Sequence, residues 1–319
     1  SGEEEDVMSG AFPIDLVLVR HGESEGNLAQ HFSKNGDDRL WTAEFGKRHT
    51  SRYRLTDVGR QQAVAAGRWI KENITHQFDA YFTSEYVRAM ETAAHLGFEG
   101  SRWNVELYLR EQDRGVLCGK SKIQRKREHS ALLERLERDV FYVAAPGGES
   151  VANACIRVDN CLELLRNKYA GQRVVVVCHG NIIEGFRVRL EGMTGFRYRQ
   201  WLKDRKANPK LGLQNGHIIQ YSRRNPETGA VHGTFRWMRS VCPYPDPDPS
   251  VWMPVAQPTF TCSDLLAEVL KVPQIINNSD ADKLRNHPAN KKPDGTPLSP
   301  RPTSKRPRVA ADGFLHESV

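Results

Sequence analysis

The chain has no long hydrophobic run, and this absence excludes one broad class of protein. A helix that crosses a bilayer needs about 18 or more consecutive apolar residues, and no segment of the 319 residues approaches that length. We therefore expect no association with a membrane through a spanning helix. The first residues are acidic rather than apolar, so we expect no secretory signal there. Together these features predict a cytoplasmic protein.

Cysteine is sparse, and its spacing fits neither a metal site nor a disulfide framework. The chain has six cysteines and no Cys-x-x-Cys pair, and the two nearest, Cys155 and Cys161, are six positions apart. Zinc knuckles and small disulfide-rich domains have closer and more regular spacing. The sequence therefore predicts reduced thiols and no structural metal.

Proline is scarce up to residue 243 and concentrated after it. Twelve of the 17 prolines lie in residues 244–319. Because proline fixes φ and lacks a backbone donor, this composition disfavours regular structure. We divide the chain into a disordered acidic leader at residues 1–11, a folded domain at residues 12–243 and a mostly disordered tail at residues 244–319.

Two features of the predicted tail suggest a partner and a location. Residues 263–270 have leucines and a valine at helical spacing, which predicts a short amphipathic helix that docks on the folded domain or on a protein partner. Residues 304–308 form a basic cluster of the kind that directs nuclear import. The nucleus is therefore a second expected location.

The predicted folded domain is strongly basic. The whole chain has 46 Lys and Arg residues against 39 Asp and Glu residues. The leader carries a charge of −4 and the tail is neutral, which leaves +11 on residues 12–243. Such an excess favours an anionic ligand. A phosphorylated metabolite and nucleic acid both fit the charge, but no nucleic-acid-binding motif accompanies it, and we rank nucleic acid last.

Short apolar runs alternate with helical patterns in the predicted domain. Strand patterns occur at residues 15–19, 79–82, 105–108, 173–178, 217–221 and 234–238. The first and fourth are continuous and Val-rich, which is typical of parallel strands covered on both faces. Helical patterns follow the N-cap residues Thr56 and Ser150. The alternation predicts a three-layer α/β/α sandwich with a mostly parallel central sheet, whose ligands bind beyond the carboxyl ends of the strands.

Two of these strands end in a histidine followed by a glycine. Arg20, His21 and Gly22 follow the first strand, and His179 and Gly180 follow the Val-rich strand at residues 173–178. Parallel strands end at the same edge of a sheet, so we expect the two histidines at the ligand-binding edge. A single histidine of this kind is more often a core residue, but two of them indicate a site.

The motifs around these residues resemble those of the histidine phosphatase superfamily, which includes phosphoglycerate mutases. The opening segment LVLVRHGESEGN is followed, in the order typical of the family, by RLTDVGRQQA, FTSEYVRAMETA, YLREQDRGVLCG, PGGESVANACIRV and VVVVCHGNIIEGF. The resemblance covers residues 14–240. It is the ordered set, rather than any single motif, that makes the resemblance specific.

The resemblance implies a role for each matched residue. His21 is implied as the nucleophile that takes the phosphoryl group, with His179 as its catalytic neighbour. Glu111 is implied as the proton donor to the leaving oxygen, and Asp113 is the alternative for that role. The implied phosphate-binding residues are Arg20, Asn27, Arg88 and Gly180. Arginine and histidine would then stabilise the charge that magnesium stabilises elsewhere, so we expect neither a metal nor another cofactor.

Two stretches differ from glycolytic mutases. The 27 residues between Asn27 and Leu55 lack the Gly-Trp pair of the mutases, and the acid motif has Glu-Gln-Asp-Arg-Gly where mutases have Glu-Arg-x-x-Gly. The sequence thus resembles the phosphatase-like members more closely. We expect a metal-independent phosphatase that hydrolyses a small phosphorylated metabolite through a phosphohistidine. The alternatives are a phosphoglycerate mutase and a binding or adaptor protein that recognises phosphate.

One basic segment is a candidate for binding a second acidic group of the substrate. Residues 120–127 contain five lysines and arginines among eight residues, in the insertion that follows the acid motif. By resemblance, this insertion covers the pocket. Its cations could bind a second phosphate or a carboxylate, or they could simply form a solvated helix face.

Overall fold

The computed structural model describes residues 11–208, 211–247, 249–255 and 257–287. Contacts divide the chain into two units, the first ending at Pro258 and the second beginning at Thr259. The predicted acidic leader up to residue 10 and the basic cluster at residues 304–308 lie outside the described residues. Among the helices that the structure describes, none is both long and apolar enough to cross a membrane.

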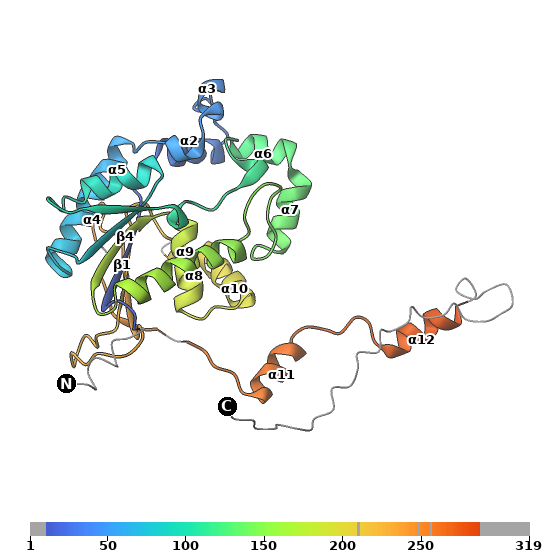
Figure 1. Cartoon of the computed structure of the whole chain (residues 1–319). Coiled ribbons are helices and arrows are strands. Elements are labelled where there is room, and N and C mark those ends of the chain that lie inside the picture. Colours follow the sequence, from blue (N-terminus) through green and yellow to red (C-terminus); the bar gives the residue numbers. More distant parts are fainter. Residues whose placement is uncertain (1–10, 209–210, 248, 256, 288–319) are drawn as a thin grey trace, which may run out of the picture. The chain divides into compact units, whose positions relative to one another are not determined.

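The first unit is built on one sheet, which in the described part of the chain has seven strands in the order β3-β2-β4-β1-β5-β6-β7 (Figure 1). The strands are β1 (Asp15–Arg20), β2 (Ala80–Ser84), β3 (Trp103–Glu106), β4 (Arg173–Cys178), β5 (Ile218–Ser222), β6 (Trp237–Val241) and β7 (Met253–Pro254). Strands β1 to β4 pair in parallel, and β5, β6 and β7 join in antiparallel pairs. The mostly parallel sheet that the sequence predicts is confirmed.

Helices cover both faces of this sheet. Helices α4 (Asp57–Asn73) and α5 (Val87–His95) pack on one face, and α8 (Val151–Lys168) and α9 (Gly180–Leu190) pack on the other. Side chains of β1 alternate between the two cores: Leu16 and Leu18 face α8 and α9, and Val17 and Val19 face α4 and α5. The strand is apolar throughout because both of its faces are buried. These layers confirm the α/β/α sandwich.

The two helices with predicted N-caps begin at those caps. The Oγ of Thr56 accepts a hydrogen bond from the backbone N of Gly59 at 3.1 Å, and Ser150 forms a capping box with Asn153. Such caps satisfy backbone donors that have no partner inside the helix, and each typically contributes about 1 kcal/mol. No disulfide joins the six cysteines.

The remaining helices of the first unit include the segments that connect the motifs. They are α2 (Glu25–Lys34), α3 (Ala43–Lys47), α6 (Lys122–Glu128), α7 (Ser130–Arg138) and α10 (Gly195–Ala207). Figure 1 shows α2, α3, α6 and α7 grouped along the upper side of the sheet. The Ser33 hydroxyl of α2 accepts a hydrogen bond from the backbone N of Lys122 in α6 at 2.9 Å. The 27-residue link and the basic insertion therefore meet.

The compact unit continues past residue 244, where the sequence predicts its end. Strand β7 pairs with β6, Val255 is buried, and the hydroxyl of Tyr244 donates to Oε1 of Gln61 at 3.0 Å. Pro254 lies in β7 at the edge of the sheet, where a missing backbone donor has little cost. Pro254 thus belongs to the sheet edge rather than to a linker.

The second unit contains α11 (Cys262–Leu270) and α12 (Asn278–Asn286). Helix α11 covers the segment for which the sequence predicts an amphipathic helix, and Thr261 caps it. Its apolar side chains Leu265, Leu266 and Val269 are exposed.

Candidate active site

The two histidines that the sequence singles out lie side by side at one edge of the sheet. His21 follows β1 directly, and His179 follows β4 directly as the N-cap of α9. Because β1 and β4 are in register from Asp15 to Arg20, the two histidines leave the sheet at the same level. Their ring centroids are 5.1 Å apart, and both side chains are buried.

Hydrogen bonds fix the tautomer of His21. Its Nδ1 lies 2.7 Å from the carbonyl oxygen of Gly22. A carbonyl only accepts, so Nδ1 carries the hydrogen and Nε2 carries a lone pair. The Nε of Arg88 donates to this Nε2 at 3.1 Å. Burial, together with the charges of Arg88 and Arg20, holds the pKa of His21 well below its ordinary value. The ring is therefore neutral near neutral pH and can act as a nucleophile.

His179 presents a donor rather than a lone pair. Its Nε2 lies 2.8 Å from Oγ of Ser84, which itself accepts from the backbone N of Tyr86 at 3.3 Å. Within the described residues the Ser84 hydroxyl has no other acceptor than this Nε2, so it donates there and the imidazole hydrogen sits on Nδ1. Nδ1 is buried and has no described partner. Burial and the charge of Arg88 hold the pKa of His179 well below its ordinary value.

One buried arginine, Arg88, and one half-buried arginine, Arg20, lie beside the histidines. Arg88 comes from α5, and its Nη1 donates to the carbonyl oxygen of Thr50 at 2.7 Å. Arg20 ends β1 and donates through Nη1 to the carbonyl oxygen of Leu213, while its Nε is buried without a described partner. In the part of the chain that the structure describes, neither arginine forms an ion pair. Their charges are left for an anionic ligand, because a buried charge needs compensation.

Glycines allow the backbone to close in around these groups. A Cβ on Gly180 would lie 3.3 Å from Nε of Arg20, and a Cβ on Gly22 would lie 2.2 Å from the carbonyl oxygen of Gly59. The backbone N of Gly22 also donates to Oγ1 of Thr92 at 3.0 Å. The contact between Gly22 and Gly59 explains why the motif after β1 occurs together with a Leu-Thr-x-x-Gly helix start.

Asn27 is tied to the same loop through a residue that the sequence analysis does not single out. Its Oδ1 accepts from the backbone N of Ser24 at 3.1 Å and from Nδ2 of Asn215 at 3.2 Å. Asn215 also donates to the carbonyl oxygen of His21 at 3.0 Å. These contacts use the Oδ1 of Asn27, and its Nδ2 is left as a hydrogen-bond donor. Asn215 lies in a loop with no motif, so no sequence signal marks it.

Glu111 is the carboxylate that acts most strongly on the two arginines. Burial lowers the pKa values of Arg20 and Arg88, and Glu111 is the charge that most opposes this change in both. Its Oε1 accepts from the backbone N of Gln112 at 2.8 Å. Asp113, the alternative acid, is exposed, and its Oδ1 accepts from the backbone N of Gly115 at 2.7 Å. Glu111 thus acts on the charges of both arginines, whereas Asp113 holds the turn at Gly115.

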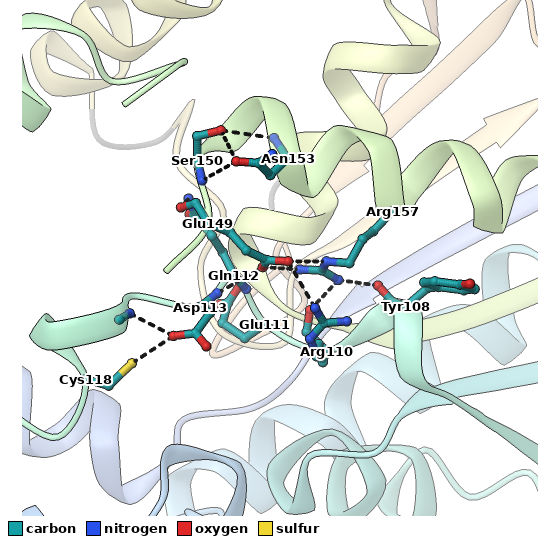
Figure 2. A network of polar contacts seen from close by, with 11 residues as sticks. Tyr108, Arg110, Glu111, Gln112, Asp113, Cys118, Glu149, Ser150, Asn153 and Arg157 are labelled. Atoms are coloured by element: carbon teal, nitrogen blue, oxygen red, sulfur yellow. Dashed lines mark hydrogen bonds and ion pairs between the residues drawn. The ribbon is translucent and has the colours of Figure 1, made fainter. Parts of the chain in front are cut away.

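A polar network holds the segment of Glu111 in place (Figure 2). Glu149 accepts from Nε and Nη2 of Arg157 at 2.8 and 2.7 Å, from Nη2 of Arg110 at 3.1 Å and from the backbone N of Asp113 at 3.1 Å. Burial raises the pKa of Glu149, but the hydrogen bonds from Arg157 and from the backbone N of Asp113, together with the charges of Arg157 and Arg110, outweigh it and leave the pKa below its ordinary value. The network therefore fixes both sides of the acid segment.

The basic insertion offers one cation of special interest. Lys120 and Arg127 pair with Glu128 at 2.7 and 2.8 Å, and so are partly neutralised. Arg125 differs, because its Nε is buried without a partner in the described residues, and burial lowers its pKa. Whether this segment binds a second anion is not tested by these contacts, and Arg125 is the member whose buried Nε has no partner in the described residues.

Two neutral histidines, two arginines without ion pairs and one carboxylate at a single sheet edge define a site for phosphoryl transfer. The chain belongs to the histidine phosphatase superfamily (branch 1), whose family model matches residues 16–208.

Relatives and solved structures agree with this family. The 2,3-bisphosphoglycerate-dependent phosphoglycerate mutase of Methylorubrum populi is 35% identical over 186 residues, which cover 56% of this chain and 80% of the mutase. The mutase of the same name from Methylocella silvestris is 33% identical over 214 residues, which cover 65% of this chain and 90% of the mutase. The α-ribazole phosphatase of Shigella flexneri has a TM-score of 0.51 at 17% identity, over 69% of this chain and 96% of that one, and shares the fold.

Proposed function

We propose that the protein is a metal-independent phosphatase that hydrolyses a phosphomonoester of a small metabolite through a phosphohistidine on His21. The observation that carries the proposal is a pair of buried donors without a described acceptor, Nδ1 of His179 and Nε of Arg20. A buried donor without an acceptor costs about 1–3 kcal/mol. The oxygens of a phosphoryl group bound at His21 would accept both hydrogen bonds.

In the first step Nε2 of His21 attacks phosphorus, and the bond to the leaving oxygen breaks. The hydrogen bond from Nδ1 to Gly22 keeps the ring oriented and stabilises the positive charge that it gains. Before this attack, the Nε–H of Arg88 moves from Nε2 of His21 to a phosphoryl oxygen of the bound ester, which frees the lone pair, and Arg20 and His179 donate to the other oxygens. Positioning and charge stabilisation of this kind supply most of the catalysis in phosphoryl transfer.

Glu111 supplies the proton transfers. It donates a proton to the leaving oxygen in the first step, and the alcohol departs. The resulting carboxylate then takes a proton from the water that attacks the phosphohistidine. This second step releases inorganic phosphate and restores both His21 and Glu111.

The test is the hydrolysis of p-nitrophenyl phosphate by the wild type and by His21→Ala, each with and without EDTA. We expect the wild-type activity to survive EDTA and to be lost in His21→Ala. His31→Ala is the matched control, because His31 is exposed on α2. Loss of wild-type activity with EDTA, or activity that persists in His21→Ala, would overturn the proposal.

The names of the relatives favour a second candidate, a phosphoglycerate mutase. Its chemistry would use the same phosphohistidine but return the phosphoryl group to a phosphoglycerate instead of to water. An assay that follows a phosphoglycerate with and without a bisphosphoglycerate separates the two. Isomerisation that exceeds phosphate release and requires the bisphosphoglycerate would favour the mutase. If the protein binds phosphate esters but turns over none of them, the adaptor alternative holds instead.

A further inference from the structure

A cavity of about 640 Å³ adjoins the phosphoryl site without being part of it. Its wall includes Gln112 and Asp113, which directly follow Glu111, and Asn181, which stands two residues after His179. None of His21, Arg20 and Arg88 lines it. In the proposed mechanism, the alcohol that Glu111 protonates would leave the phosphorus near this cavity. Its volume is in the usual range for sites that enclose a small organic ligand.

Much of the lining is apolar. The aliphatic side chains come from the segment after the acid motif, from α7 with the residues that follow it, and from α8 and α10: Leu117, Leu136, Val140, Val143, Val151 and Leu202. Apolar walls bind apolar ligand surface in proportion to the area removed from water. A purely polar substrate, such as a short phosphorylated acid, would leave these walls without a partner.

The polar part of the lining has an excess of positive charge. Two of its cations are neutralised: Arg205 by Glu184, and Lys206 by Glu137 at 3.4 Å. Lys203 has no ion pair among the described residues, and it projects from the same helix, α10.

Among the residues that the structure describes, two further arginines on the lining donate to neutral acceptors and form no ion pair. Arg199 donates to the carbonyl oxygen of Arg138, and Arg114 donates to Oδ1 of Asn181 at 3.2 Å. Together with Lys203, these two arginines form a group of positive charges on the wall of a largely apolar cavity. A ligand that fits both parts has an apolar body and an acidic end.

We propose that this cavity holds the alcohol part of the substrate and selects phosphomonoesters whose apolar body ends in a second anion, a carboxylate or a phosphate. The inference rests on the proposed function, because it places the reacting phosphate at His21. An apolar body of roughly six to ten carbon atoms suits the volume. The second anion then lies against Lys203 and Arg199 while the first is cleaved.

Three substrates test the proposal: p-nitrophenyl phosphate, octyl phosphate, and the phosphate ester of ω-hydroxyoctanoate. We expect kcat/KM for the carboxylated ester to exceed that for octyl phosphate by about tenfold, a factor that corresponds to about 1.4 kcal/mol. The double variant Lys203→Gln with Arg199→Gln should reduce this ratio to about one. Arg197→Gln is the matched control, because Arg197 is exposed on α10 and does not line the cavity. It should leave the ratio unchanged.

Calorimetric binding of the two octyl esters to His21→Ala separates this inference from the proposed function. Tighter binding of the carboxylated ester, lost when Lys203→Gln and Arg199→Gln are added, supports the cavity even if no ester is hydrolysed. The inference is overturned if the two esters bind equally, or if the preference survives the double substitution, whatever the result with p-nitrophenyl phosphate. Failure of hydrolysis alone overturns only the phosphatase.

Discussion

Arg88 donates its Nε–H to Nε2 of His21 over 3.1 Å, so a buried cation holds the lone pair that would attack phosphorus. A protonated imidazole could not accept this hydrogen bond. The contact therefore selects the neutral ring, and the charge of Arg88 lowers the pKa of His21 in the same sense as burial does. In the proposed mechanism, Arg88 would thus both keep His21 neutral and donate to a phosphoryl oxygen.

Substitution of Arg88 should therefore change both the rate and its pH dependence. We expect Arg88→Ala to lower kcat by about 100- to 1000-fold, the usual cost of losing one such donor. The rate falls as the pH drops through the pKa of His21, because only the neutral ring attacks. Removal of the cation raises this pKa, so the acid limb of the kcat/KM profile should move to higher pH. An acid limb in the same place as in Arg68→Ala, a control on the exposed face of α4, would contradict this account.

The acid role should separate Glu111 from Asp113. We expect Glu111→Gln to slow hydrolysis of an alkyl phosphate far more than that of p-nitrophenyl phosphate, because an alkoxide needs a proton to leave and a nitrophenolate does not. Asp113→Asn should change either rate only a few-fold, since Asp113 is exposed and accepts from the backbone N of Gly115. Equal losses in the two variants, measured as kcat for both substrates, would count against Glu111 as the acid.

The sequence was sufficient to predict the central layers of the fold, because their signals are local. The Val-rich runs of β1 and β4 and the caps of α4 and α8 need no tertiary information. The edge was harder to predict. The pattern at residues 105–108 falls across the end of β3 and a following 3₁₀ turn, because β3 is half-exposed and has no clear alternation of burial. Strand β6 begins at Trp237, three residues after the predicted start.

The candidate site could be predicted only as far as its motifs reach. His21 and His179 stand in motifs at strand ends, where the sequence analysis expects a site. Asn215 and Thr50 lie outside the motifs and reach the site through an amide and a backbone carbonyl, in contacts that depend on how distant segments pack. The cavity beside Glu111 is likewise made by several segments that are far apart in the sequence, so no single one of them reveals it.

Gly59 offers a test of the contact between the first two motifs. In the solvent-exposed interior of a helix, Gly→Ala stabilises the folded protein by about 1 kcal/mol. Here a Cβ would lie 2.1 Å from the carbonyl oxygen of Glu23, and backbone atoms cannot easily move away. We expect Gly59→Ala to lower the free energy of unfolding by about 1–3 kcal/mol, measured by urea denaturation. Gly46→Ala in α3 should not lower it, since its Cβ would meet only an ordinary contact at 3.4 Å. Equal stabilities of the two variants would refute the steric argument.

The network behind the acid segment should matter for stability and for rate. We expect Arg157→Met to cost about 3 kcal/mol of stability, because among the described residues it leaves the half-buried Glu149 carboxylate with Arg110 as its one ion-pair partner. The kcat should fall as well, since the segment of Glu111 loses its support. Arg189→Met breaks an exposed pair with Asp159 and should cost less than about 1 kcal/mol. The stability of both variants is measured by thermal unfolding, and their kcat by turnover. If Arg157→Met and Arg189→Met lose similar amounts of stability, the network has no structural role.

The most direct test of the account is to trap the covalent intermediate. The protein is mixed with a phosphomonoester that carries a radiolabelled phosphate, quenched in alkali within one turnover, and digested for peptide mapping. The account predicts label on the peptide that contains His21, at a level that rises and decays at the rate of turnover. Turnover without any labelled enzyme, or label on a residue other than His21, would contradict it.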